Sequence, residues 1–240
     1  MSSNPKKILI IPAAGIGSRM ELDLPKQYLK LSNNKTILDN TILALLKEPF
    51  FDLVIISLSD KDKYWIESEF ANHSLVKTCI GGKTRFHSVY NALSFIKDST
   101  DKEDWIFVHD AARPCINIEN VKKLFKEVSN SNVNSNSGIL AVKAFETVKE
   151  CTNSQITKTL NRENIWLAQT PQLSKYGELL KAFNYCSNNN LVNSVTDEAS
   201  ALELYGDNPI IVEGLRSNIK VTKQEDIEFV EFFLYQNNKS

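Results

Sequence analysis

The 240-residue chain is poor in arginine and carries almost no net charge. Only five of its 28 basic residues are arginine, and the formal net charge at pH 7 is −1. A chain this close to neutral has no overall field that would draw it onto nucleic acid or an anionic membrane. Because lysine is the usual cation here, each arginine is expected where a planar, bidentate partner for phosphate is needed.

The sequence also lacks long apolar runs and paired cysteines. Its apolar runs are too short for a membrane span, and "MSSNPKK" has no apolar stretch of signal-peptide length. Four widely spaced cysteines form no C-x-x-C pair: Cys79, Cys115, Cys151 and Cys186. We therefore expect a cytoplasmic protein with reduced thiols, in preference to a disulfide-bonded or zinc-binding one.

Strand-like runs alternate with helical patterns along most of the chain. The runs are "ILIIPA", "LVIISLS", "LVKTCI", "WIFVHD" and "GILAV", and helical spacing of apolar residues is found at 36–48, 62–70, 85–96 and 117–129. This alternation predicts an α/β fold of Rossmann-like type, with a mostly parallel sheet flanked by helices and right-handed crossovers.

The pattern changes after residue 143. The segment "KAFETVKECTNSQITKTLNRENIW" alternates β-branched and polar residues around "TNSQ", which predicts a projecting β-arm at about 143–163. An arm of this kind exposes paired strand edges that a partner subunit commonly covers. We therefore expect a homodimer formed through the arm.

Helical patterns return in the last third of the chain. They lie at 174–187, 196–206 and 224–236, and short strands are predicted at 209–214 and 218–222. No internal repeat is visible. The chain is accordingly predicted to be a single domain, 1–240, with the arm inserted into it.

The loop after the first strand, "IPAAGIGSRMELDLPKQYLKL", has the composition of an anion site. Gly15 and Gly17 allow backbone N–H groups to converge on an anion, and Arg19 and Lys26 add positive charge. The dinucleotide fingerprint is not met, because Met20 occupies the place of its third glycine, and no Walker loop is present. A nucleotide could still bind here, although not through either of these two common motifs. The alternative is that the glycines only form a turn.

Two further loops follow strands that should end beside the first one. "GGKTRFHS" leads from a glycine pair into a helix, and "VHDAARP" places Asp110 at a strand end. An acidic residue facing two cationic glycine loops suits Mg²⁺, which favours carboxylate and phosphate oxygens. Alternatively, Asp110 caps the next helix or simply pairs with Arg113.

Six motifs in order carry a specific resemblance. They are "PAAGIGSRM…PKQYL", "GG…R…SV", "HDAARP", "LAQTPQ", "TDEASALE" and "NIKVT", and together they span nearly the whole chain. In this order they resemble the 2-C-methyl-D-erythritol 4-phosphate cytidylyltransferases of the non-mevalonate isoprenoid pathway. The resemblance implies a nucleotidyltransferase fold, a β-arm homodimer, CTP and a sugar-alcohol phosphate as substrates, and Mg²⁺ or another hard divalent cation.

The resemblance also implies site residues. The nucleotide would be bound by Ala13, Ala14, Gly15, Gly17, Arg19, Lys26, Gly81, Gly82, Ser88, Asp110 and Ala111. The acceptor would be bound by Asp110, Arg113, Thr147, Arg162, Thr170, Thr196 and Lys220, with Thr147 and Arg162 reaching it from the partner subunit's arm. Arg19, Lys26 and Lys220 would be catalytic, and Asp110 would hold the metal.

The chain departs from the family at two places. Lys83 stands where an acidic residue often follows the glycine pair, and "AFETV" replaces a "VRDTV"-like stretch, which keeps Thr147 but removes a neighbouring arginine. The main alternative is a ribitol 5-phosphate cytidylyltransferase, which resembles "HDAVRP" and "TDACK" where this chain has "HDAARP" and "TDEAS". A sugar-binding regulatory protein is disfavoured, because Arg19, Lys26 and Asp110 are all retained.

The predicted reaction is transfer of CMP from CTP to 2-C-methyl-D-erythritol 4-phosphate, giving 4-diphosphocytidyl-2-C-methyl-D-erythritol and pyrophosphate. The acceptor's phosphate oxygen is anionic at neutral pH, so the step needs no general base. It needs in-line positioning and relief of charge at the α-phosphorus.

Overall fold

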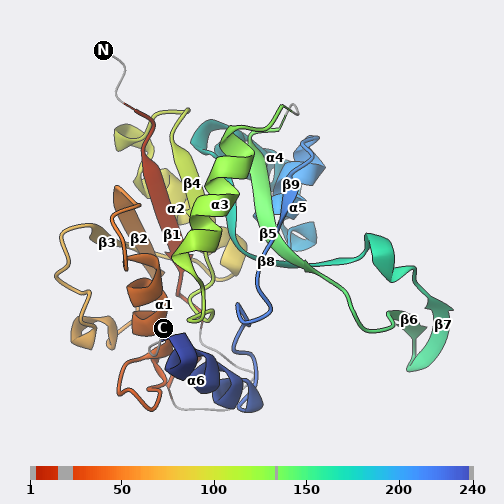
Figure 1. Cartoon of the computed structure of the whole chain (residues 1–240). Helices are drawn as coiled ribbons and strands as arrows, with labels where there is room; N and C mark the ends of the chain where they lie inside the picture. The colour runs from red at the N-terminus through yellow and green to blue at the C-terminus, as the bar shows by residue number, and fades with distance from the viewer. Residues whose placement is uncertain (1–3, 16–23, 133–134, 238–240) are drawn as a thin grey trace.

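A computed structural model of the chain describes residues 4–15, 24–132 and 135–237 (Figure 1). Within these residues the central sheet has seven strands in the order β3-β2-β1-β4-β8-β5-β9. They are β1 (Lys7–Pro12), β2 (Leu53–Leu58), β3 (Val76–Ile80), β4 (Trp105–Val108), β5 (Ser137–Lys143), β8 (Trp166–Lys175) and β9 (Ile210–Glu213). Only β8 runs antiparallel to its neighbours among these described strands. The predicted α/β fold with a mostly parallel sheet is confirmed.

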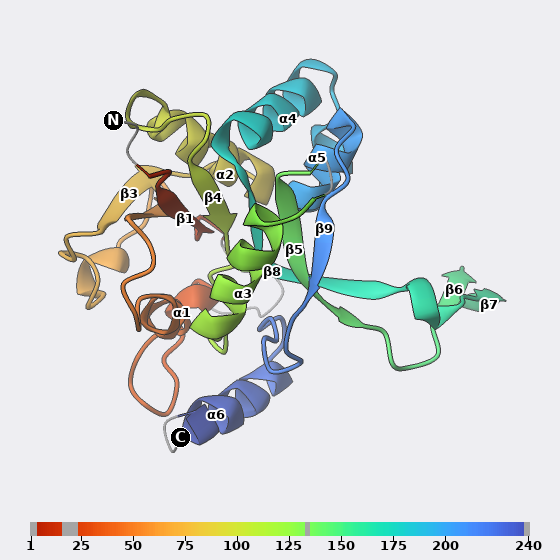
Figure 2. The ribbon, with the colours of Figure 1, turned by 45° about the horizontal axis from the view of Figure 1, so that its top comes forward.

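Helices cover both faces of the sheet (Figure 2). They are α1 (Ile37–Leu45) and α3 (Ile118–Ser129) on one face, and α2 (Arg85–Phe95), α4 (Tyr176–Asn188) and α5 (Glu198–Tyr205) on the other. The alternation of β1 explains the two layers, since Leu9 and Ile11 pack against α1 and α3 while Ile8 and Ile10 pack against α2 and α4.

The last helix, α6 (Glu225–Asn237), lies off both faces and beside α1 (Figure 1). Val230 of this helix packs in a small core with Leu31, Ile37, Cys115 and Val221. It therefore fixes the chain that follows β9 near the carboxyl ends of β1 and β4. None of the helices in the described part of the chain is long and apolar enough to cross a membrane.

Strand β8 is not predicted by the apolar pattern. Its buried side chains include Gln169, Thr170, Gln172 and Ser174, so it lacks the apolar alternation that marks a half-buried strand. A proline interrupts it as well, and the pairing of β8 with β5 shifts register at this point, between Ile139 and Ala141. The strand forms because its polar side chains find partners inside the protein, as when Gln172 donates to Asp197 Oδ2 at 2.8 Å.

Two predicted elements are wrong. The helix expected at 62–70 is reduced to a 3-10 turn at Trp65–Glu67, because the backbone becomes extended at Ser68, whose hydroxyl donates to Asp39. Asp62 Oδ1 accepts the N–H groups of Tyr64 and Trp65 at the start of the turn. The strand expected at 218–222 is irregular chain, held by separate bonds to loops at the end of the sheet.

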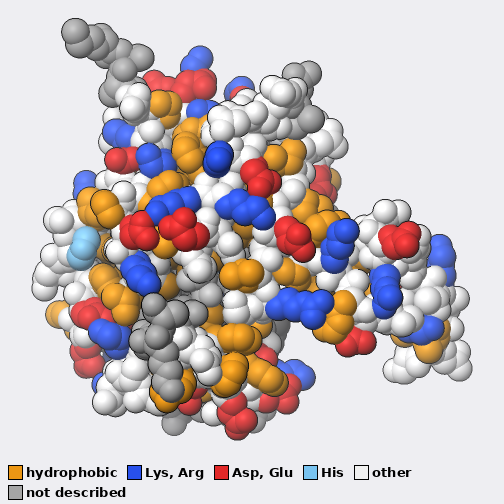
Figure 3. Space-filling model, in the orientation of Figure 1, with side chains coloured by type: hydrophobic (Ala, Val, Ile, Leu, Met, Phe, Trp, Pro, Cys, Tyr) orange, Lys and Arg blue, Asp and Glu red, His pale blue; other side chains and the backbone are white. Residues whose placement is uncertain are grey.

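Residues 149–159 form a separate two-stranded hairpin of β6 (Lys149–Thr152) and β7 (Gln155–Thr159). Asn153 and Ser154 make its turn with positive φ values of 49° and 64°. Every residue of both strands is exposed, and the hairpin projects from the body with acidic and basic side chains interspersed (Figure 3). Its use in a dimer, and the single domain spanning 1–240, stay predictions.

Candidate active site

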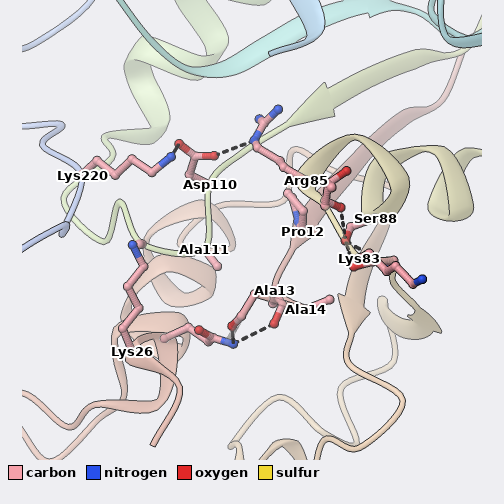
Figure 4. A pocket seen from close by; sticks show the side chains of 15 residues that line it. Pro12, Ala13, Ala14, Lys26, Lys83, Arg85, Ser88, Asp110, Ala111 and Lys220 are labelled. Atoms are coloured by element: carbon pink, nitrogen blue, oxygen red, sulfur yellow. Dashed lines mark hydrogen bonds and ion pairs between the residues drawn. The ribbon is translucent and has the colours of Figure 1, made fainter. Parts of the chain in front are cut away.

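A pocket of about 200 Å³ opens where β1, β3 and β4 end (Figure 4). This is the edge at which parallel α/β sheets bind ligands. Its described lining is Pro12, Ala13, Ala14, Gly15, Lys26, Gln27, Gly82, Lys83, Thr84, Arg85, Ser88, Asp110, Ala111, Ala112 and Lys220. Residues that the sequence predicts in three separate loops therefore meet at one site.

The loop after β1 is held in place by Gln27, whose role is not predicted from the sequence. Its amide nitrogen donates to the carbonyls of Ala13 and Gly15 at 2.7 and 3.1 Å, and its side chain is buried. The N–H of Ala13 donates to Ser57, so Ala13 shapes the pocket without offering this N–H to an anion. Gly17 and Arg19 lie outside the described residues.

The glycine pair after β3 permits close packing of two loops. A Cβ on Gly81 would lie 2.6 Å from the Cβ of Ala14, and one on Gly82 would lie 2.3 Å from the Cβ of His87. Ser88 Oγ accepts the N–H of Gly82 at 3.1 Å and thereby closes the turn. The pair thus places the second glycine loop directly against the first, with Gly82 and Ser88 in the pocket wall.

Three cations converge on the carboxylate of Asp110. Arg85 Nε donates to Oδ1 at 3.1 Å, while Lys220 Nζ and Arg113 Nε lie 2.9 and 3.3 Å from Oδ2. Burial alone would raise the pKa of Asp110, but these cations hold it well below its usual range. Asp110 does not cap the next helix, since Asn117 does so. The ion pair with Arg113, which the sequence left open as an alternative for Asp110, is present.

Arg85 also bonds a second carboxylate, on the side of its guanidinium that faces away from Asp110. Its Nη1 and Nη2 donate to the two oxygens of Glu198 at 2.7 and 2.9 Å, and Glu198 is 2% exposed. The guanidinium therefore bridges Glu198 and the pocket carboxylate Asp110. Desolvation would lower the pKa of Arg85, but the two carboxylates raise it above its ordinary value.

His109, next to Asp110, is fully buried and has a structural role. Nε2 donates to the carbonyl of Arg113 (3.2 Å), and Nδ1 accepts the hydroxyl of Thr170 (3.0 Å), which itself accepts the N–H of Asp110 at 3.1 Å. One neutral tautomer satisfies all three bonds. Thr170, a predicted acceptor ligand, is buried and uses its hydroxyl inside the protein.

Lys220 reaches the pocket from an irregular segment of residues 214–222, called the strap below. The N–H of Val221 donates to Ala112 at 2.8 Å, and its carbonyl accepts Lys26 Nζ at 2.9 Å. Lys26 and Lys220, both predicted catalytic residues, therefore line one pocket although they lie in chain segments that are far apart in the sequence.

Asn218 fastens the strap to the sheet. Asn218 is 1% exposed, and its side-chain nitrogen donates to the carbonyl of Thr170 at 2.8 Å, while its backbone carbonyl accepts Arg113 Nη1 at 2.7 Å. Arg113 is therefore a support that joins Asp110 to the strap, and it is not among the described residues that line the pocket.

Three predicted acceptor ligands lie elsewhere. Thr147 and Arg162 are exposed at the base of the β6–β7 hairpin, where Arg162 donates to the carbonyl of Phe145. Thr196 is exposed just before α5, within 3.4 Å of Ser200 Oγ. None of the three is among the described lining residues, and their contact with an acceptor stays a prediction.

Three residues that organise the site are not predicted from the sequence, although each falls inside one of the six motifs. Gln27 lies in "PKQYL", Glu198 in "TDEASALE" and Asn218 in "NIKVT". Their types give no chemical signal, since an amide or a glutamate at a helix start usually faces solvent. Only the tertiary contacts give them a role.

A divalent cation fits the site in one way. Asp110 is the one acidic side chain among the described lining residues, and no cluster of three or more metal-ligating side chains occurs in the described part of the chain. Mg²⁺ commonly binds through one or two carboxylates plus substrate phosphates. Since three cations already bond Asp110, such an ion would depend mainly on phosphate oxygens.

Folding stability is expected to depend on His109 between pH 6.5 and about 4. Burial lowers the pKa of His109 from 6.5 to about 4, so in this window the unfolded chain binds a proton that the folded chain does not. Stability is therefore complete above pH 6.5 and is lost on acidification, by at most about 3 kcal/mol. Urea unfolding at several pH values measures the loss.

The matched variant is His109→Gln, which has no titrating group and can still form hydrogen bonds. It should lose less unfolding free energy than the unsubstituted chain between pH 7 and 4. Equal losses in both proteins would show that His109 does not carry this pH dependence.

Sequence comparison identifies the family to which this chain is similar. A profile of the 2-C-methyl-D-erythritol 4-phosphate cytidylyltransferase family matches residues 7–236. The chain is 41% identical over 238 residues to the enzyme of that name from Vesicomyosocius okutanii, covering 95% of this chain and 96% of the relative. It is 42% identical over 231 residues to the one from Aliivibrio fischeri (strain ATCC 700601 / ES114), covering 96% and 94%.

A solved structure agrees with these sequence matches. The crystal structure of the 2-C-methyl-D-erythritol 4-phosphate cytidylyltransferase of Francisella tularensis superposes with a TM-score of 0.84 and 51% identity, covering 95% of this chain and 99% of that one. The matches support methylerythritol phosphate rather than ribitol 5-phosphate as the acceptor. The chain therefore belongs to the 2-C-methyl-D-erythritol 4-phosphate cytidylyltransferase family, nucleotidyltransferases that transfer CMP from CTP to this acceptor in isoprenoid biosynthesis.

Proposed function

We propose that the pocket at the ends of β1, β3 and β4 is where this CMP transfer takes place. The observation that supports it most is the set of cations around Asp110, with Lys26 and Lys220 in the same pocket wall. The triphosphate of CTP would lie against the β1 loop and Lys26. The cytidine would lie toward Gly82 and Ser88, and the acceptor toward Lys220.

The proposed chemistry is a single displacement. An oxygen of the acceptor's phosphate attacks the α-phosphorus of CTP, forms a new P–O bond, and breaks the bond from that phosphorus to the bridging oxygen of the leaving pyrophosphate. No proton has to be removed from the attacking oxygen. Negative charge grows on the non-bridging and leaving oxygens, and Lys26 supplies fixed positive charge there.

Lys220 is suited to orient the acceptor. Its Nζ is held by Asp110 Oδ2 at 2.9 Å, which fixes the ammonium at the pocket while its remaining donors can bind a phosphate. Arg19 is proposed to act with Lys26. It lies outside the described residues, and its role stays a prediction.

We propose Mg²⁺ as the cofactor, held by Asp110 together with the phosphates of CTP. When bound, it would polarise phosphate oxygens and neutralise part of their charge. The protein's own contribution is to keep Asp110 ionised and oriented, which the neighbouring Arg85 and Lys220 do.

The exposed hairpin is proposed to pair two subunits. A two-stranded hairpin with no buried face is marginal on its own in water, so a partner surface would account for its persistence. Thr147 and Arg162 at its base would then enter the partner's acceptor site.

A cytoplasmic location is proposed from the four cysteines, all of them free thiols.

Lys26 gives the most direct test of the catalytic proposal. Lys26→Ala removes one preorganised cation, so kcat for pyrophosphate release from CTP and methylerythritol phosphate should fall about 100-fold to 1,000-fold. Lys30→Ala is the matched control, because Lys30 is an exposed lysine nearby that does not line this pocket, and it should keep normal turnover. Normal turnover in Lys26→Ala would refute the proposed role of this pocket.

The composite site is tested by mixing two inactive variants. An Arg162→Ala subunit paired with a Lys26→Ala subunit leaves one intact site in each mixed dimer if Arg162 acts across the interface. Random exchange makes half the dimers mixed, so the mixture should recover about a quarter of full activity. Size-exclusion chromatography first checks that the chain is a dimer and exchanges subunits. An exchanging mixture that stays inactive, or a monomeric chain, would contradict the proposal.

A further inference from the structure

We propose that Glu198 is a positioning residue for CMP transfer, acting through Arg85 to hold the carboxylate of Asp110 in the pocket. The inference rests on the proposed function, because it assumes that Asp110 faces the bound substrates. Glu198 is not among the described lining residues, whereas Arg85 and Asp110 both are. Any effect of Glu198 on the reaction must therefore pass through a neighbour.

The contacts of Arg85 fix the direction of its guanidinium. Both terminal nitrogens donate to Glu198, at 2.7 and 2.9 Å, and Nε donates to Asp110 Oδ1 at 3.1 Å. A planar fork with two parallel bonds on one carboxylate cannot rotate without breaking both of them. While Glu198 holds the fork, Nε remains directed at Asp110.

Glu198 is itself held on a rigid support. It is the first residue of α5, where the positive end of the helix favours a negative charge. Gln172 of β8 accepts the N–H of Ala199 and donates to Asp197, each at 2.8 Å. Since β8 pairs with β4, Gln172 fixes the start of α5 to the strand beside the one that Asp110 follows.

Charge gives the second reason for a glutamate at this position. Arg85 lines a pocket that also contains Lys26 and Lys220, and the proposed ligand is a triphosphate. Without Glu198, Nη1 and Nη2 of Arg85 would be available to phosphate oxygens, and Arg85 could bond the substrate instead of Asp110. Glu198 accepts hydrogen bonds from both of these nitrogens, and Arg85 therefore bonds Asp110 rather than the substrate.

The test is a double-mutant cycle on steady-state pyrophosphate release, with Glu198→Gln, Arg85→Lys and the double variant. Glu198→Gln keeps the shape of the side chain but removes its charge and one acceptor oxygen. We expect kcat to fall between about 10-fold and 100-fold while KM for CTP changes less than about 3-fold. A displaced Asp110 should slow the transfer step more than it weakens the binding of CTP. Because both changes break one link, the double variant should lose no more than the worse single variant.

Leu202→Ala is the matched control for a purely structural effect. Leu202 lies on the same helix, is 2% exposed and packs in the core without lining the pocket. Its truncation should lower the midpoint of thermal unfolding and leave kcat at 25 °C near that of the unsubstituted chain.

Three results would overturn the positioning role. These are an unchanged kcat in Glu198→Gln, losses that multiply in the double variant, and a raised KM for CTP at unchanged kcat. If Glu198→Gln does not fold, Arg85→Lys compared with Leu202→Ala gives the same test of kcat against KM. Failure of the unsubstituted chain to release pyrophosphate from CTP would instead refute the proposed function.

Discussion

The buried carboxylate of Asp110 is the interaction on which the site depends. It follows β4 in the middle of the sheet and is only 7% exposed, yet it stays ionised because three cations bond it. A carboxylate at this depth would be costly without such partners. The same bonds join α2, the loop after β4 and the strap, so one charge brings together segments from both halves of the chain.

Each cation at Asp110 has support from a different part of the fold. Arg85 is held by Glu198 at the start of α5, and Arg113 donates to the carbonyl of Asn218 in the strap. The strap that carries Lys220 is bonded to Ala112 and Lys26 through Val221. A displacement of phosphate by phosphate needs charge and alignment more than proton transfer, and this arrangement supplies fixed charge without a titrating base.

The part of the fold that could be predicted is the part with a regular apolar pattern. Strands β1 to β5 and β9 and the α-helices of the described residues follow from runs and spacings, because burial of one face or both leaves a period in the sequence. Strand β8 has no such period, since Gln169, Thr170 and Gln172 are buried through bonds to other elements. The turn at Trp65–Glu67 does not continue as the predicted helix because the backbone is extended at Ser68, whose hydroxyl donates to Asp39.

The residues of the candidate site likewise fall into those that a local sequence pattern predicts and those that it does not. Lys26, Gly82 and Asp110 could be predicted, because strand ends in a parallel sheet meet at one edge and their motifs lie at those ends, whereas Lys220 is implied only by the family resemblance. The roles of Glu198 and Asn218 could not, since they depend on contacts across 113 and 105 residues of chain that no local pattern encodes.

A crystal structure of the chain with a non-hydrolysable CTP analogue and Mg²⁺ tests the central claim most directly. We predict that the triphosphate lies against the β1 loop and Lys26, with Asp110 beside the α-phosphate and still bonded to Arg85. A nucleotide bound away from these strand ends, or an Arg85 that has left Asp110 for the phosphates, would contradict it.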